Sequence, residues 1–167
     1  MADFLTTILE HKHRILAAQK DVYATLRKKA AAAPKNTAEL FKKNISRSGQ
    51  INLIAEIKKA SPSAGVLRKD FNVEAIAKIY AEHKAAAISV LTEDRYFSGK
   101  PEDILTVSKC VNLPVLTKDF IISDGQIHEA KVNGAAAILL IVAILGDNEL
   151  NGLLNIAREF GLDCLVE

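Results

Sequence analysis

Residues 52–65 read Asn52-Leu-Ile-Ala-Glu-Ile-Lys-Lys-Ala-Ser-Pro-Ser-Ala-Gly65, an apolar run that ends in charged residues and is followed by turn-forming residues. The first half has the length and the β-branched content of a strand. Because side chains alternate along a strand, Glu56 and Lys58 are expected on the same face. The Ser-Pro-Ser-Ala-Gly segment that begins at Ser61 predicts a loop whose hydroxyl and N–H groups are suited to a phosphate or a carboxylate.

Four further apolar runs of strand length follow at nearly constant intervals. Their last residues lie 26, 24 and 25 positions apart. Amphipathic helical patterns fill the intervals, with helix caps expected at Asn72, Asp124 and Asp147. This alternation predicts an α/β protein with a parallel sheet, either a (β/α)-barrel or a doubly wound sheet. The four runs are Ala86-Ala-Ile-Ser-Val-Leu-Thr92, Leu113-Pro-Val-Leu-Thr-Lys118, Ala137-Ile-Leu-Leu-Ile-Val142 and Leu162-Asp-Cys-Leu-Val-Glu167.

Residues 1–50 precede this pattern and differ from it. We expect them to form an N-terminal helical cap and linker over one end of a partial (β/α) barrel, which residues 51–167 would form with strands 1 to 5. The basic side chains of the cap are expected to face solvent, and binding of a polyanion is the alternative. The expected parts of the cap are a long charged helix over 4–22, a hinge at 30–34, a short basic helix over 37–43 and a linker at 46–50.

The composition argues against several classes of protein. Lysine and arginine total 22 against 20 acidic residues, and this net charge of +2 gives no reason to expect a nucleic-acid or membrane partner. The longest apolar run, residues 135–145, is too short to span a bilayer. Cys110 and Cys164 stand far apart without a CxxC partner, which favours reduced cysteines in a cytoplasmic protein.

The histidines and glycines argue against other kinds of site. His11, His13, His83 and His128 fall on expected helices away from the strand ends, so neither a metal site nor a catalytic triad is expected. Neither G-x-G-x-x-G nor G-x-x-x-x-G-K-[ST] occurs, which argues against standard dinucleotide and P-loop sites.

Charged residues gather where the parallel strands are expected to end. Glu56 and Lys58 close the first strand, Lys118 the third and Glu167 the fifth. In an α/β barrel these carboxyl ends surround the active site, so the four groups are candidates for acid–base work and for holding an anion. Mutual salt bridges that mark where buried strands reach water are the alternative explanation. Phe97 and Phe120, in loops at the same end, are candidates for the wall of an aromatic-ligand pocket; packing is the alternative.

The quoted stretch, continued to Leu67, resembles the signature of the indole-3-glycerol phosphate synthase family, (β/α)8-barrel enzymes of tryptophan biosynthesis. The N-terminal helix with Ile8, Leu9 and Lys12 is similar to the extra cap of that family, so the resemblance covers essentially the whole chain. The supporting segments, in the order of the family, are Val90-Leu-Thr-Glu-Asp-Arg-Tyr-Phe-Ser-Gly99, Pro114-Val-Leu-Thr-Lys-Asp-Phe-Ile121, Ala137-Ile-Leu-Leu-Ile-Val142 and Leu165-Val-Glu167.

The resemblance implies a carboxy-lyase that acts on 1-(2-carboxyphenylamino)-1-deoxyribulose 5-phosphate, a small phosphorylated molecule, and closes the indole ring with loss of CO2 and water. It implies that Lys118 is the acid near the ketone oxygen and that Glu167 is the base that assists dehydration. Lys58 matches a lysine that contacts substrate anions and is a second candidate proton donor, so the order of the two lysines stays open. Glu56 matches a carboxylate that orients these groups.

The resemblance also implies how the substrate is held. Ser61 matches a substrate-contacting residue, while Phe97, Phe120 and Leu139 match an apolar pocket around the aromatic ring. No metal ion and no organic cofactor are implied.

The number of strands departs from the pattern of the family. The barrel of the family has eight strands and this chain supplies five, so we expect a truncated chain that is inactive alone. Its open sheet edges would favour association with the missing barrel half or with a second copy. Two alternatives are another phosphate-binding barrel enzyme, such as a phosphoribosylanthranilate isomerase, and a non-catalytic partial barrel that associates through its open edges.

Overall fold

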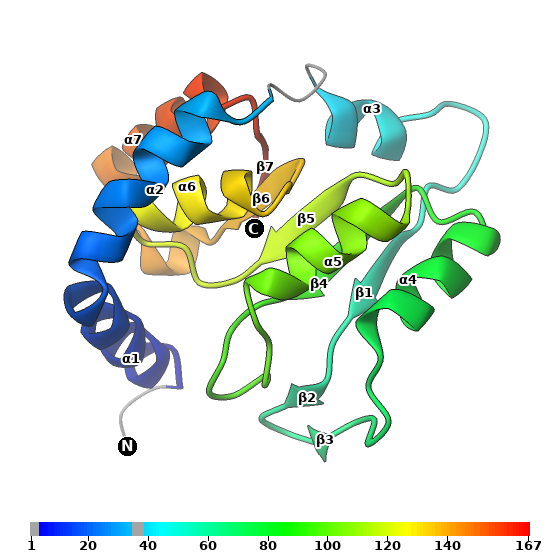
Figure 1. The fold of residues 1–167 in the computed structure, drawn as a ribbon, viewed down its shortest axis with the longest axis horizontal. Helices are drawn as coiled ribbons and strands as arrows, with labels where there is room; N and C mark the ends of the chain where they lie inside the picture. The colour runs from blue at the N-terminus through cyan, green and yellow to red at the C-terminus, as the bar shows by residue number, and fades with distance from the viewer. Residues whose placement is uncertain (1–3, 35–38) are drawn as a thin grey trace.

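The computed structural model describes residues 4–34 and 39–167. Five strands form one parallel sheet in the order β1-β4-β5-β6-β7 (Figure 1). This spatial order follows the chain, as expected when a helix connects each strand to the next. The strands of the sheet are Ile54–Ile57 (β1), Ala87–Leu91 (β4), Val115–Lys118 (β5), Ala137–Leu140 (β6) and Asp163–Val166 (β7).

The predicted α/β class and its parallel sheet are confirmed. Strands β4 and β6 are buried along their whole length, as expected for inner strands covered on both faces. Strands β1 and β7 lie at the two edges, so the sheet formed by the described residues is not closed. The strand pairing places Glu56 opposite Ser89 and Leu91 opposite Lys118. The carboxyl ends of these strands therefore lie next to each other, at the same end of the sheet.

Alternation of side chains divides the sheet into two faces. Ile88 and Val90 of β4 belong to a core cluster that includes Ile104 and Val107 of the following helix. Neighbouring Ala87 belongs to a second cluster, on the other face. We call the first face outer and the second face inner. The outer face packs on the helices α4 (Val73–Glu82), α5 (Glu102–Cys110), α6 (Asp124–Val132) and α7 (Asp147–Glu159).

The starts of these helices lie within one residue of the predicted caps. Asn72 caps α4 as predicted. The prediction was wrong by one residue at α6, where Ser123 takes the cap position and Asp124 is the first helical residue. It was wrong by one residue at α7 as well, where Gly146 precedes the helix that begins at Asp147. An acid in the first turn interacts favourably with the helix dipole, so Asp124 and Asp147 still favour helix initiation.

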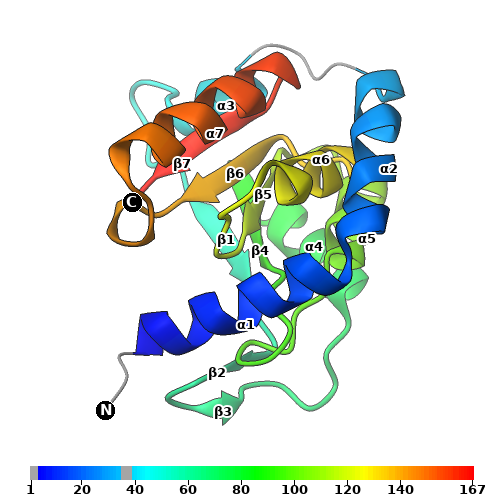
Figure 2. The same ribbon diagram turned by 90° about the vertical axis from the view of Figure 1, so that its left-hand side faces the viewer.

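The N-terminal helices reach both ends of the sheet (Figure 2). Helix α1 (Phe4–Ala18) crosses the carboxyl ends of the strands, and α2 (Lys20–Ala32) packs along α6. Helix α3 (Leu40–Ile45) packs on the inner face near the strand starts, through Phe41. The backbone N–H of Lys42 donates a hydrogen bond to Asp163 Oδ2 at 3.0 Å, which fixes α3 to the start of β7.

Two details of this segment were not predicted. The expected helix over 4–22 breaks at Gln19, and the helix that follows continues through residues 30–32, where a hinge was expected. Consecutive alanines are strong helix formers, so this run extends α2 rather than ending it. The first part of the short helix expected over 37–43 lies outside the described residues, while the rest belongs to α3.

The predicted loop after β1 contains a small antiparallel hairpin, β2 (Ala60–Ser61) with β3 (Gly65–Val66). Gly65 has a φ of 65°, a left-handed conformation that glycine adopts without steric cost. Among the described residues, no helix is both long and apolar enough to cross a membrane.

Candidate functional site

A cavity of about 260 Å³ opens on the inner face at the carboxyl ends of the strands. The alternation that separates the two faces places residues 56, 58, 91, 118, 139 and 167 on the same side as this cavity. Seven of the eight predicted site residues line it, and Ser61 does not. The lining residues are Glu56, Lys58, Leu91, Phe97, Lys118, Asp119, Phe120, Leu139, Ile141 and Glu167.

The first charged pair belongs to β1. Lys58 Nζ lies 2.6 Å from Glu56 Oε1, and each side chain keeps about a third of its surface exposed. The spacing of two residues on a strand produces this contact, because it puts both side chains on the inner face. An ion pair with this much exposure to solvent contributes little to stability. Its two groups remain available to a ligand.

The second charged pair joins β5 to the residue after β7. Lys118 is the last residue of β5, and its Nζ lies 3.4 Å from Glu167 Oε2. The backbone of Glu167 is held by β6, since its N–H donates to the Leu140 carbonyl and its carbonyl accepts the Val142 N–H. A lysine and a glutamate thus stand side by side at the mouth of the cavity.

Aromatic and aliphatic side chains supply the apolar wall. The rings of Phe97 and Phe120 lie 6.4 Å apart between centroids with their planes inclined at 37°. Leu139 and Leu91 are buried beneath them. Charged groups on one side and an apolar wall on the other are the combination expected of a pocket for an aromatic anion.

Asp119 also lines the cavity, and sequence reasoning did not single it out. It is buried beside Lys118, and its Oδ1 lies 2.6 Å from the Nζ of Lys12 on α1. Its Oδ2 accepts a hydrogen bond from Thr92 Oγ1 at 2.7 Å, and its Oδ1 accepts the N–H of Phe120, also at 2.7 Å. Asp119 therefore joins the N-terminal helix to the ends of β4 and β5. The available signal was an acid directly after a strand-end lysine.

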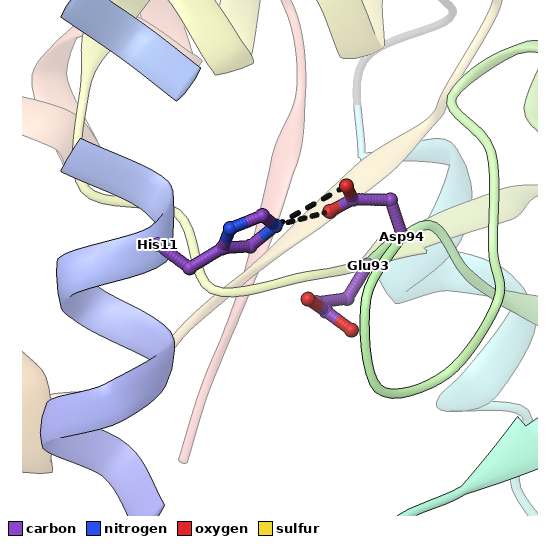
Figure 3. A group of neighbouring side chains, drawn as sticks. All are labelled: His11, Glu93 and Asp94. Carbon is purple, nitrogen blue, oxygen red and sulfur yellow. Dashed lines mark hydrogen bonds and ion pairs between the residues drawn. The ribbon is translucent and has the colours of Figure 1, made fainter. Parts of the chain in front are cut away.

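A second missed group lies in the loop after β4 (Figure 3). His11 on α1 is hydrogen-bonded through Nε2 to Asp94, at 3.1 Å to Oδ1 and 3.2 Å to Oδ2. The expectation that the histidines lie away from the strand ends was therefore wrong for His11, because α1 crosses the carboxyl ends of the strands. Glu93 is fully buried next to them, and its carboxylate accepts backbone N–H groups of its own loop.

The ligand atoms of His11, Glu93 and Asp94 lie within 4.8 Å of one another, a spacing that a metal site also shows. Hydrogen bonds already account for this arrangement. Both oxygens of Glu93 accept backbone N–H groups, and Asp94 is paired with the histidine.

Ser61 stands apart from the cavity, in the hairpin after β1. Its hydroxyl oxygen accepts the N–H of Ala64 at 3.2 Å, which closes the turn. The sequence interpretation of Ser61 as a substrate contact stays a prediction.

An adjoining cavity of about 200 Å³ separates α1 from α5 and α6. Glu129 lies there, and burial is the main cause that raises its pKa to about 7, with the negative charges of Asp119 and Glu102 adding to the effect. Lys12 and a hydrogen bond with Tyr23 act in the opposite direction. Burial also raises the pKa of Tyr23. A carboxyl group that titrates near neutrality therefore lies beneath the N-terminal helix.

A parallel sheet whose carboxyl ends bring lysines, glutamates and an apolar pocket together is typical of α/β proteins of the barrel type, which bind their ligands at that end. The family follows from the sequence comparison. The family model for indole-3-glycerol phosphate synthase matches residues 5–167, and the chain belongs to this family.

Individual relatives agree with this assignment. The chain is 46% identical over 165 residues to a protein of Chlorobaculum tepidum and 52% identical over 119 residues to one of Carboxydothermus hydrogenoformans. It is 44% identical over 171 residues to a protein of Acidithiobacillus ferrooxidans. All three are named indole-3-glycerol phosphate synthase.

The matches also show how much of the relatives is covered. The Chlorobaculum alignment includes 98% of this chain and 64% of the relative, and the Acidithiobacillus alignment 100% and 65%. The Carboxydothermus alignment includes 71% and 45%. The chain thus spans less than two thirds of the length of the relatives that it matches.

Proposed function

We propose that this chain carries the β1-to-β7 part of an indole-3-glycerol phosphate synthase active site. The reaction would close the indole ring of 1-(2-carboxyphenylamino)-1-deoxyribulose 5-phosphate with loss of CO2 and water. The observation that carries the proposal is the single cavity in which two lysines, two glutamates and two phenylalanines come together. The resemblance to the family implies that these groups serve the reaction for which the relatives are named.

Lys118 and Glu167 are proposed as the acid and base. As the ring carbon that bears the carboxylate attacks the ketone carbon, negative charge develops on the ketone oxygen, and Lys118 donates a proton there. The protonated ketone oxygen is now a hydroxyl group, and loss of CO2 from the ring carbon that formed the new bond restores the aromatic ring. Glu167 then removes a proton from the CH2 carbon next to the hydroxyl-bearing carbon, while the Lys58 ammonium, the second candidate donor, protonates the hydroxyl group, which leaves as water as the C=C bond forms. The 3.4 Å between the Lys118 and Glu167 side chains lets them act on neighbouring atoms of one substrate.

Lys58 and Glu56 are proposed to bind and orient the substrate. The Lys58 ammonium would face the carboxylate of the substrate, and Glu56, 2.6 Å away, holds the lysine side chain in place. Lys58 is also the second candidate proton donor. Phe97, Phe120 and Leu139 would enclose the aromatic ring, and Ser61 would contact the substrate from the hairpin.

We further propose that the open edges of the sheet are covered by the remainder of a barrel. Strands β1 and β7 lie at these edges, and the apolar residues Leu53 and Val166 next to or within them are exposed. Unpaired edges with apolar neighbours favour strand addition. Alternatively, a second copy of the chain covers these open edges. A cytoplasmic location stays a prediction from the sequence.

The test joins this chain to the C-terminal part of a relative that the alignment does not cover. The chain alone and a chimaera that continues into the C-terminal third of the Chlorobaculum protein are assayed for the fluorescent indole product. We expect turnover from the chimaera and none from the chain alone. Lys118→Ala or Glu167→Gln in the chimaera should lower kcat by about 1,000-fold or more, as expected for loss of an acid or base.

Matched controls separate these roles from a general loss of charge. Lys109→Ala and Glu159→Gln remove the same charges from exposed positions on α5 and α7, and both variants should keep full activity. A chimaera that folds but gives no product would contradict the proposed function. Unchanged turnover in Lys118→Ala or Glu167→Gln would contradict the role of that residue.

A further inference from the structure

We propose that Glu93 is a positioning residue that fixes the loop after β4, so that the Phe97 ring is held at the cavity wall. The inference deepens the proposed function, because it concerns the pocket that would receive the aromatic ring. Glu93 follows β4 by two residues, has 0% of its surface exposed and does not line the cavity. It therefore acts on the site through the backbone of its own loop.

Three consecutive backbone N–H groups converge on the Glu93 carboxylate. Oε1 accepts the N–H of Arg95 at 3.1 Å, while Oε2 accepts those of Tyr96 at 2.6 Å and Phe97 at 3.0 Å. Hydrogen bonds to a carboxylate are stronger than those between neutral groups, and water does not compete at a fully buried site. The carboxylate thus sets the path of the backbone up to Phe97.

The backbone around Phe97 is held from the other side as well. The Phe97 carbonyl accepts the N–H of Ala60 at 3.2 Å, and the N–H of Gly99 donates to the Glu93 carbonyl at 2.8 Å. A Cβ at Gly99 would overlap the carbonyl of Leu91, so the loop closes tightly onto the strand end. Because Ala60 follows Lys58 by two residues, the bond to Phe97 also ties this loop to the segment that bears the lysine.

Helix α1 also contacts the loop after β4. His11 pairs with Asp94, and the Phe4 ring meets the Tyr96 ring edge-on at 5.1 Å between centroids. Asp94 is bound to His11 on α1, while the Glu93 carboxylate beside it accepts the backbone N–H groups of its own loop (Figure 3). The Phe97 ring then lies 6.4 Å from the Phe120 ring between centroids, and both rings line the cavity.

A fluorescence experiment tests the positioning without any substrate. The chain contains no tryptophan, so Phe97→Trp introduces a single indole at the cavity wall. Glu93→Gln in that background replaces one acceptor oxygen by an NH2 group that faces N–H donors. We expect the indole emission to shift to longer wavelength and its quenching by acrylamide to rise about threefold, since a buried acceptor is lost.

Glu149→Gln in the same background is the matched control. Glu149 also accepts a backbone N–H, that of Gly146 at 2.9 Å, but it does so at the start of α7 and outside the cavity. This variant should leave emission and quenching unchanged. Equal quenching in the variants with and without Glu93→Gln, with circular dichroism showing both folded, would overturn the proposal.

Amide hydrogen exchange on the unsubstituted chain keeps the test decisive if Glu93→Gln does not fold. The N–H groups of Arg95, Tyr96 and Phe97 should exchange about 100-fold or more slowly than in an unstructured peptide. Rates close to those of the peptide would overturn the proposal. Neither measurement depends on catalysis, so an inactive chimaera would count against the proposed function and not against this role of Glu93.

Discussion

The loops that follow β1 and β4 both carry site residues, yet they are built in different ways. The loop after β4 contains the buried Glu93, packs under α1 and is held by bonds on both sides. In the loop after β1, every residue from Pro62 to Asp70 is exposed, and the Ser61 hydroxyl closes the turn. One loop is therefore fixed by buried polar groups, while the other forms a small hairpin in solvent that does not line the cavity.

The largest difference is expected between two ion pairs. Asp119→Asn removes the buried partner of Lys12 and should lower the free energy of unfolding by about 3–5 kcal/mol, because it leaves a buried charge unpaired. Asp70→Asn removes an exposed partner of Arg68 and should cost less than about 0.5 kcal/mol. Asp119 follows β5 and accepts a hydrogen bond from Thr92 at the end of β4, so it belongs to the buried network under α1. Urea denaturation measures both values, and equal values would remove the distinction between this buried network and the exposed loop after β1.

Two glycines give the next comparison. Gly99→Ala puts a Cβ against the Leu91 carbonyl and should destabilise the protein by about 3 kcal/mol, since backbone must move. Gly65→Ala meets no atom within 4 Å and has only a left-handed φ to tolerate, so it should cost about 1 kcal/mol. Thermal and urea denaturation of the two variants measure this difference. The reverse order would show that the β4 loop yields more easily than the hairpin.

The free energy of unfolding is expected to depend on pH through Glu129, which lies beneath α1. The pKa of Glu129 is raised from its ordinary value of 4.5 to about 7 in the folded protein. The unfolded chain therefore loses this proton first, and the contribution of Glu129 to stability decreases as the pH rises from about 4.5 to 7. Allowing for its partial exposure, the decrease is about 1–2 kcal/mol.

Glu129→Gln tests this expectation because glutamine does not titrate. The difference in unfolding free energy between the parent and the variant should change by that amount between pH 5 and pH 7.5. Glu74→Gln on the exposed face of α4 is the control, and its pKa is lowered by Lys78, so any change there has the opposite sign. A pH-independent difference for Glu129→Gln would contradict the raised pKa.

The smallest effect on stability is expected in the hairpin. Ser61→Ala removes one solvent-exposed hydrogen bond, to Ala64, and should change the free energy of unfolding by about 0.5 kcal/mol. In the active chimaera the same substitution should raise KM with little effect on kcat, if Ser61 contacts the substrate. An unchanged KM would contradict that predicted contact.

The features that local patterns encode could be predicted from the sequence. The apolar runs gave the five strands, and the spacing of Glu56 and Lys58 anticipated that both face the cavity. The predicted caps at Asp124 and Asp147 were each wrong by one residue, because the cap positions belong to Ser123 and Gly146. Serine or glycine followed by aspartate offers two adjacent candidates for the cap. The helix break at Gln19 has no proline or glycine to mark it.

The network behind the cavity could not be predicted in the same way. Lys12 and Asp119 are far apart in the chain, and their contact depends on where α1 crosses the sheet. His11 was placed away from the strand ends for the same reason. Glu93 is the intermediate case: its partners are two to four residues ahead, but its complete burial could not be predicted from that spacing.

The bond between Lys42 and Asp163 has a consequence for the order of folding. It joins residues 121 positions apart, and α3 gains this partner only after β7 exists. At about 10 residues per second, a ribosome needs roughly 12 s to make the intervening chain. During that time α3 lacks this anchor, although Asp119, the partner of Lys12 on α1, is made earlier. Helix α3 is therefore expected to reach its final position only after the last strand has been synthesised, although α3 itself is made before the first.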